Sequence, residues 1–278
     1  MRINQLYIAA SCLALTIIGY AHGKQAAEVY SKSGSMDHYE SVAQSRSLYC
    51  RGDVRIFLDG ASKEDEVHAL SHSVSIDTSN QDGLKSTIIQ GGVGGNQESY
   101  DVLISGQHLL ENFEAIYLED NCALETAGLH LEGLKLYSNT NGRITLRGTY
   151  KASSITQLKD NVIDAYWMDS DFLEIESRAG RMILAGTAKH VRAFARGKAF
   201  LSLDSLRAKD VWLAGYDESF IRFHGENIIL SSYMDGAAHA ESLGFPTKVS
   251  DQSNSHGALV YHLPQFEKIS TEVGHAGP

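Results

Sequence analysis

The sequence predicts an all-β protein: a right-handed parallel β-helix with rungs of roughly 19 residues and a less regular N-terminal third. Three observations support this prediction. Short apolar-x-apolar segments recur along the chain, and each is followed by Gly, Asp or Asn. Residues 142–149 return, with small changes, 38 residues later as residues 180–187. After residue 24, no stretch keeps the 3.6-residue apolar period of a helix over three turns, and residues 107–116 are the best short helical candidate.

The repeated unit has the chemistry of a strand that is buried on one face. In Ile144-Thr145-Leu146-Arg147-Gly148 the two apolar side chains lie two residues apart, so they point to the same side of a strand. The glycine that follows permits a sharp bend. One such strand cannot bury its apolar pair alone, but a stack of strands builds a continuous core, and the 38-residue offset fits two rungs. An antiparallel sandwich or barrel is the alternative.

Similar units begin at Leu129, Val211 and Ile221. In the units at Leu129, Ile144 and Ile221 the intervening residues are polar, and we expect them to face solvent because they alternate with the buried pair. The expected outward residues are His130, Glu132, Thr145, Arg147, Arg222 and His224.

The first residues have the pattern of a secretory signal peptide. Arg2 precedes an apolar run over residues 6–21, and small residues follow up to Gly23. The run is shorter than the roughly 20 residues of a membrane-spanning helix, so we expect cleavage and no stable transmembrane span, with an uncleaved anchor as the alternative. The expected organisation is a signal peptide at 1–23, a flexible leader at 24–46, a β-helical domain at 47–263 and a flexible tail at 264–278.

Charge and cysteine content limit the partners and the compartment. The net charge of −10 disfavours nucleic acid as a partner, because phosphates repel an acidic chain. We expect an exported protein in the periplasm, in the outer envelope or secreted. Cys50 and Cys122 are the only cysteines beyond the predicted signal peptide, and an even number permits one disulfide. Two free, buried thiols fit the sequence equally well.

Residues from about Tyr49 to Tyr261, roughly three-quarters of the chain, resemble the putative auto-transporter adhesin head (GIN) domain family. The resemblance rests on the opening Gly52-Asp53-Val54-Arg55-Ile56, on the repeated Gly-x-apolar-x-Leu-x-Gly unit and on Gly257-Ala258-Leu259-Val260-Tyr261. It implies a right-handed β-helix, export to the cell envelope and an adhesive role, and it supplies no catalytic residues. The turns at residues 141–143 and 179–181 depart from the Ser-Gly-Ser-Gly of many members.

One basic cluster stands out in this acidic chain. Lys189, Arg192, Arg196 and Lys198 are the candidate ligand-binding residues, and an acidic glycan or a lipopolysaccharide phosphate would suit them. The alternative is a solvated turn between two rungs, with Phe194 in the core.

Other patterns do not define a site by themselves. Asp169, Asp171, Glu174 and Glu176 have the chemistry for glycoside cleavage or calcium binding, but they also suit a charged, solvated strand. The glycine-rich residues 90–96 lack the Gly-Lys-Ser/Thr of a phosphate-binding loop. The twelve histidines show no zinc motif. We therefore predict no catalytic residues, no metal and no cofactor.

The expected function is that of a non-enzymatic envelope or secreted protein, an adhesin-like module that presents one face of its β-helix to polysaccharide or protein. The alternative is a polysaccharide lyase or glycoside hydrolase on the same scaffold, which requires a groove with convergent carboxylates and a basic residue. A purely structural envelope component would bind no soluble ligand. The sequence leaves the oligomeric state open.

Overall fold

The computed structural model describes residues 42–262 except for residues 72, 82–83, 92–99, 227 and 255–256. The predicted signal peptide, most of the predicted leader, most of the glycine-rich segment 90–96 and the tail 264–278 lie outside the described residues. The strands are β1 Ser47–Gly52, β2 Arg55–Asp59, β3 Glu66–Ala69, β4 Val74–Gln81, β5 Leu84–Gly91, β6 Val102–Ser105, β7 Ala115–Asp120, β8 Ala123–Ala127, β9 Leu129–Thr140, β10 Ile144–Gln157, β11 Val162–Ser177, β12 Arg181–Ala195, β13 Phe200–Gly215, β14 Phe220–His224, β15 Ile229–Met234, β16 His239–Leu243, β17 Lys248–Asp251 and β18 Ala258–His262, and the one-turn helix α3 is Gln107–Leu110.

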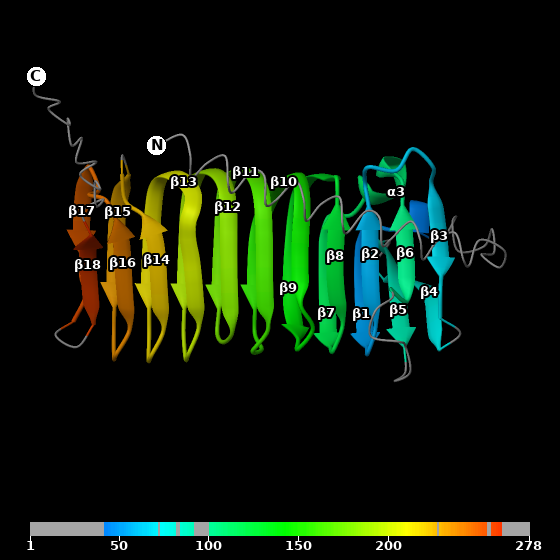
Figure 1. The fold of residues 1–278 in the computed structure, drawn as a ribbon, viewed down its shortest axis with the longest axis horizontal. Coiled ribbons are helices and arrows are strands. Elements are labelled where there is room, and N and C mark those ends of the chain that lie inside the picture. Colours follow the sequence, from blue (N-terminus) through cyan, green and yellow to red (C-terminus); the bar gives the residue numbers. More distant parts are fainter. Residues whose placement is uncertain are drawn as a thin grey trace, which may run out of the picture.

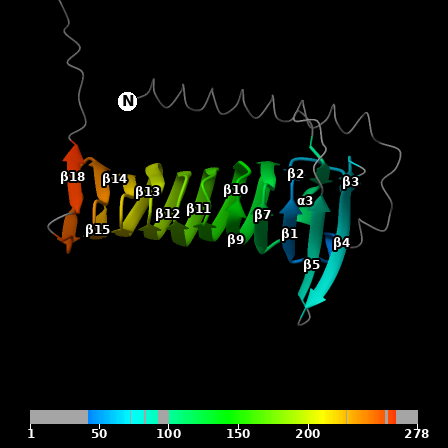
Figure 2. The same cartoon turned by 90° about the horizontal axis from the view of Figure 1, so that it is seen from below.

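The strands stack in parallel register as a β-solenoid, which confirms the predicted fold class (Figure 1). Ile144 pairs with Ile163 in the next rung, and Ile163 pairs with Met182 in the rung after it. These partners are 19 residues apart, so the 38-residue offset between the two similar segments spans two rungs. Figure 2 shows the same stack from below, with successive strands side by side.

The solenoid has three faces, named here by their ladders. Face A contains β1, β5, β7, β15, β17 and the C-terminal parts of β9 to β13. Face B contains β2, β6, β8, β14, β16, β18 and the N-terminal parts of β10 to β13. Face C is the shorter ladder between them, made of residues 129–133, 148–151, 168–172, 186–190 and 205–210.

Each strand contributes alternate residues to one central core. In β11, Leu173 and Ile175 are buried, whereas Glu174 and Glu176 point outward. The inward apolar residues of most rungs belong to a single cluster that runs from Val42 to Ala240. The stack therefore provides the continuous burial that one rung cannot achieve alone.

Sharp corners separate face B from face C. In β10 and β12 the corner contains glycine: Gly148 has φ 149° and Gly186 has φ 138°. A Cβ atom at these positions would lie 2.0 Å from the carbonyl oxygen of Leu129 and 2.2 Å from that of Met168, respectively. Glycine is needed here because the backbones of adjacent rungs approach too closely for any side chain.

Buried polar side chains line the turn from face A to face B. Asn161 donates from Nδ2 to the Ser138 hydroxyl and to the Gly142 carbonyl, both at 3.0 Å. The Ser177 hydroxyl donates to Gln157 Oε1 at 2.8 Å. These bonds join successive rungs at a place where the backbone turns and cannot form a regular ladder.

The N-terminal third is less regular, as predicted. The rung made of β1 and β2 lies between the rung of β5 and β6 and the rung of β7 and β8, although it precedes both in the sequence. Beyond it, β3 and β4 pair in antiparallel orientation with β6 and β5 and cover that end of the stack (Figure 1). Such strands protect the open hydrogen-bonding edge of a sheet. At the other end, β17 and β18 pair on one side only among the described strands.

Two features of the N-terminal third add detail to the sequence predictions. The predicted helical segment at 107–116 contains a helix of one turn, α3. Val42 and Ser45 are fully buried, so packing against the core begins at residue 42 of the described chain. None of the described helices has the length and hydropathy needed to span a membrane.

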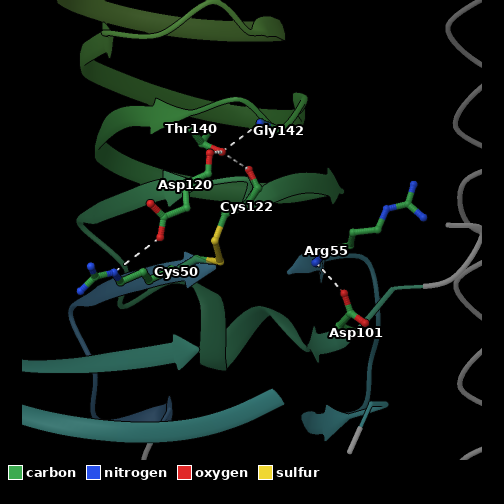
Figure 3. Close-up of a disulfide and its surroundings, with 8 residues drawn as sticks. Cys50, Arg55, Asp101, Asp120, Cys122, Thr140 and Gly142 are labelled. Carbon is green, nitrogen blue, oxygen red and sulfur yellow. Dashed lines mark hydrogen bonds and ion pairs between the residues drawn. A yellow bond between two sulfur atoms is a disulfide. The ribbon is translucent and has the colours of Figure 1, made fainter. Parts of the chain in front are cut away.

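Cys50 in β1 and Cys122, between β7 and β8, form a disulfide in the structure, with Cα atoms 6.1 Å apart (Figure 3). Both residues are buried. The bond ties the inserted first rung to the next rung of the stack, across 72 residues of sequence.

Candidate functional site

The structure divides the four predicted basic residues between two environments. Lys189 lies on face C, and its Nζ is 2.5 Å from Asp171 Oδ1. Lys198 lies in the turn after β12, and its Nζ is 3.7 Å from Glu218 Oε2. Both lysines thus have an acidic partner from a neighbouring rung.

Arg192 and Arg196 lie instead on aromatic rings. The Arg192 guanidinium is 4.9 Å from the centroid of Phe194 and 5.1 Å from that of Trp212. The Arg196 guanidinium is 5.1 Å from the centroid of Tyr216. Phe194 therefore points outward beside Arg192 rather than into the core. We call Arg192, Phe194, Arg196, Trp212 and Tyr216 the face A cluster.

Aromatic residues continue along face A on both sides of this cluster. Tyr216 is 5.8 Å from Tyr233 in the following rung. Towards the N-terminal end, Tyr49, Tyr117 and Tyr137 occupy one column of successive rungs, with centroid separations of 4.3 and 6.0 Å. Face A thus carries aromatic rings, most of them half-exposed, on several rungs. Thr156 and Glu176 interrupt the column between Tyr137 and Phe194.

The four carboxylates singled out in the sequence do not converge. Asp169 and Asp171 lie on face C, whereas Glu174 and Glu176 lie past the next corner on face A. Asp169 accepts a hydrogen bond from Thr187, and Glu176 pairs with Arg178 at 2.8 Å. The arrangement is that of a charged outer surface, as the alternative interpretation of these residues expected.

Face C carries a row of alternating charges across four rungs. Lys151 Nζ lies 2.6 Å from Glu132 Oε2, and Lys189 pairs with Asp171. The hydrogen bond that Lys151 donates to Glu132 raises the pKa of the Lys151 ammonium group, and the hydrogen bond from Lys189 lowers the pKa of the Asp171 carboxyl group. Since these groups are exposed, solvent screens their attraction and the row contributes little to stability.

The sequence did not predict the pocket that opens on face B. It has a volume of about 320 Å³ and lies over β8, β10 and β11. Its lining residues are Glu125, Arg143, Thr145, Arg147, Asp164, Tyr166 and Trp167.

Thr145 occupies the centre of this pocket. In the parallel ladder it pairs with Glu125 on one side and with Asp164 on the other. Arg147 Nη1 lies 3.1 Å from Glu125 Oε1, and Arg143 Nη2 lies 2.5 Å from Asp164 Oδ2. Thr145 points outward as predicted, but it is only 8% exposed because these neighbours cover it. The expectation that it faces bulk solvent is therefore wrong.

A second layer holds Glu125 in place. The Tyr100 hydroxyl donates to Glu125 Oε2 at 2.5 Å. Burial and this carboxylate raise the pKa of the Tyr100 phenol above its ordinary value, so the phenol remains a neutral donor. Glu125 is thus fixed by Arg147 from one side and by Tyr100 from another.

Trp167 forms the rim of the pocket in a strained conformation. It lies at the corner between faces B and C in β11, where the neighbouring strands have glycine, and its φ is 62°. A non-glycine residue in this region costs roughly 1–2 kcal/mol. The indole is 47% exposed and tilts against Tyr166, with ring centroids 6.2 Å apart. Residues held in such sparsely populated backbone conformations cluster at active sites and ligand-binding sites.

The sequence contained the parts of this pocket but not their assembly. Arg143, Thr145 and Arg147 alternate along one strand, and that pattern is visible in the sequence. Glu125 and Asp164 come from adjacent rungs, so only the exact register brings them to Thr145. Trp167 was the one pocket residue that the sequence could have marked. It stands where the neighbouring strands β10 and β12 have the corner glycines Gly148 and Gly186.

The described residues contain no group of three or more His, Cys, Asp and Glu side chains arranged to hold a metal ion. Several histidines lie beside single carboxylates instead, such as His190, whose Nδ1 is 2.9 Å from Asp210 Oδ2.

Comparison with known proteins identifies similar folds but shows no family for this chain. No family model matches the chain, and no curated protein matches it either. The crystal structure of a "putative adhesin" from Bacteroides fragilis NCTC 9343 superposes with a TM-score of 0.51, over 79% of this chain and 93% of that chain, at 13% identity. A "putative adhesin" from Parabacteroides merdae ATCC 43184 superposes with a TM-score of 0.55, over 79% and 92% of the two chains, at 15% identity.

The chain is therefore a parallel β-solenoid protein. Its fold is the one seen in these adhesin-like bacterial structures, and at such low identity the likeness concerns the fold alone.

Proposed function

We propose that this chain is an exported, non-enzymatic binding protein of the cell envelope or the secreted fraction, an adhesin-like module of the GIN type that presents face A to acidic polysaccharide. The observation that carries the proposal is the face A cluster, in which Arg192 and Arg196 lie on the rings of Phe194, Trp212 and Tyr216. The adhesin-like fold and the signal-like N-terminus support export.

The chemistry of the cluster suits a sugar chain that carries carboxylate or sulfate groups. Arginine offers planar paired donors to such groups, and an aromatic ring beneath it restricts its motion. The half-exposed rings beside the arginines can pack against the apolar face of a sugar. The regular rungs also place further aromatic side chains along the same face, which suits an extended polymer.

Paired substitutions test this proposal. Arg192→Ser with Arg196→Ser should weaken binding to immobilised acidic polysaccharides, such as polygalacturonate and heparin, by roughly tenfold or more. The matched control is Lys189→Ser with Lys198→Ser, which removes the same charge but affects residues that already pair with Asp171 and Glu218. Equal losses in both variants would show only a general charge effect, and unchanged binding in the arginine variant would refute the proposal.

Export has its own test. The native protein should be recovered from the envelope or the culture medium, and N-terminal sequencing should find a start near Lys24. An intact Met1 in the cytosol would contradict the export proposal without affecting the face A cluster.

A second candidate function has a specific basis in the face B pocket. Glu125 and Asp164 lie on either side of Thr145 with arginines beside them, which is the arrangement that a polysaccharide-cleaving enzyme requires. Each carboxylate is already paired with an arginine, which favours binding over proton transfer. Prolonged incubation with polysaccharides should release no new reducing ends or unsaturated products. Release that Glu125→Gln or Asp164→Asn abolishes would replace the binding proposal with the enzymatic one.

A further inference from the structure

We propose that the face B pocket beside Trp167 binds an uncharged pyranose ring of a polysaccharide. This inference shares with the proposed function only the class of polymer, since the pocket lies on a different face from Arg192 and Arg196. Its volume of about 320 Å³ is at the lower end of small-molecule sites, which suits one sugar ring rather than an extended segment.

The charges of the pocket favour an uncharged ligand. Two carboxylates, Glu125 and Asp164, are matched by two guanidinium groups, Arg147 and Arg143. An anionic ligand would have to compete with a carboxylate already in place for each arginine. Sugar hydroxyls need no such exchange, because they can donate to the remaining carboxylate lone pairs and accept from the remaining guanidinium N–H groups.

Thr145 provides a hydroxyl group at the floor of the pocket. The residue is 8% exposed, and in the parallel ladder Glu125 and Asp164 lie on either side of it. A threonine hydroxyl can both donate and accept a hydrogen bond, so a ligand hydroxyl in the pocket can bond to it and to the neighbouring carboxylates.

Trp167 provides the apolar wall. Its indole stands at the rim of the pocket beside Tyr166, and it remains 47% exposed in the free protein. A pyranose ring has one face of C–H groups that can pack flat on such a ring, while its edge presents hydroxyls. The indole stands at a corner where the adjacent strands have glycine, and the backbone of Trp167 is strained there. The rest of the fold therefore holds the indole in place at a cost in conformational energy.

The chain has only two tryptophans, and each marks one proposed site: Trp167 the pocket and Trp212 the face A cluster. In the Trp212→Phe variant, all tryptophan fluorescence therefore reports on the pocket. Titration with methyl glycosides of glucose, galactose, mannose and N-acetylglucosamine should give a saturable change with at least one of them at millimolar concentration, as weak single-ring binding requires. The Trp167→Phe variant, which reports Trp212, should give none with the same sugar.

Thr145→Val tests the floor of the pocket. It preserves the shape of the side chain, and we expect it to weaken binding of that sugar by roughly three- to tenfold. The matched control is Thr149→Val, the same change at an exposed position of the same strand, which should leave the affinity unchanged. The methyl glycoside of glucuronate is titrated beside the neutral sugars as the anionic comparison. No saturable response with any neutral glycoside would overturn the inference, as would a response to the glucuronate glycoside alone or an equal response from Trp212. Loss of acidic polysaccharide binding in the arginine variant is a separate result, so each proposal can fail alone.

Discussion

Gln157 lies directly against Asn161 inside the turn from face A to face B, and its Nε2 donates both to the Asn161 carbonyl at 2.7 Å and to Asn161 Oδ1 at 2.8 Å. Asn161 in turn donates to Ser138 and Gly142 of the previous rung. One buried side chain therefore connects three segments of the chain at a place without a backbone ladder.

Replacement of Asn161 by alanine should destabilise the protein by about 2–4 kcal/mol, because it leaves several buried polar groups without partners. Urea unfolding of the purified chain measures this loss. Asn141→Ala is the control, since Asn141 bonds to Asn121 at an exposed position of the neighbouring turn and its loss should cost well under about 1 kcal/mol. Equal effects of the two changes would show that the buried network adds nothing.

Replacement of Tyr150 by phenylalanine, which removes only the hydroxyl group, should stabilise the protein. Its side chain is 1% exposed, and its hydroxyl has no hydrogen-bond partner among the described residues. Burial accordingly raises the pKa of the phenol. Because an unpaired buried hydroxyl costs roughly 1–3 kcal/mol, Tyr150→Phe should raise the free energy of unfolding by about 1 kcal/mol.

Tyr137 is the control, because its side chain is half-exposed. Tyr137→Phe should leave the free energy of unfolding nearly unchanged. A destabilised Tyr150→Phe variant would mean that the hydroxyl has a partner, such as a buried water molecule.

The Cys50–Cys122 disulfide should form in the native protein and should contribute to its stability. The bond closes a loop of 72 residues, for which chain entropy gives roughly 4 kcal/mol. Mass spectrometry of a non-reduced digest should detect the linked peptides, and the Cys50→Ser, Cys122→Ser double variant should unfold at lower urea concentration. Two free thiols in protein taken from its native compartment would contradict this prediction.

The strain at Trp167 predicts an unusual order of stabilities. Because φ is 62° there, Trp167→Gly should be more stable than Trp167→Ala by about 1 kcal/mol, although both remove the indole. At Phe172, an exposed strand residue of the same strand β11, the order should reverse, since glycine is the poorer residue in an ordinary strand. Thermal unfolding of the four variants measures both differences. The same order at both sites would show that the corner is not strained.

The sequence was sufficient to predict the rung because burial repeats along the chain. Ile144 and Met182 have equivalent positions two rungs apart, as the repeat indicated. The similar units at Leu129 and Val211 are not their equivalents, since the first lies on face C and the second on face A. Every face buries alternate residues, so the local pattern alone cannot assign a strand to a face.

The candidate site was predicted only in part, for a related reason. Arg192 and Arg196 both lie on the outer side of face A. Lys189 lies on face C, before the corner that leads to face A, and no glycine marks that corner in the sequence. The face B pocket combines residues about 20 positions apart in the sequence, such as Glu125, Thr145 and Asp164, whose proximity depends on exact register. A shift of one residue would turn each of these side chains into the core.

The position of the first rung also affects how the chain can fold as it emerges during synthesis. Both neighbours of β1 and β2 come later in the sequence. Residues 47–59 find their first partner strands, β5 and β6, only when the chain has emerged as far as Ser105, and they have partners on both sides only when it has emerged as far as Ala127. From β10 onward, each new rung can instead stack on one that is already complete. When the chain emerges from its N-terminus, this first rung should therefore wait longest between its emergence and its pairing, and it should depend most on chaperones, because its contacts are the most distant in sequence.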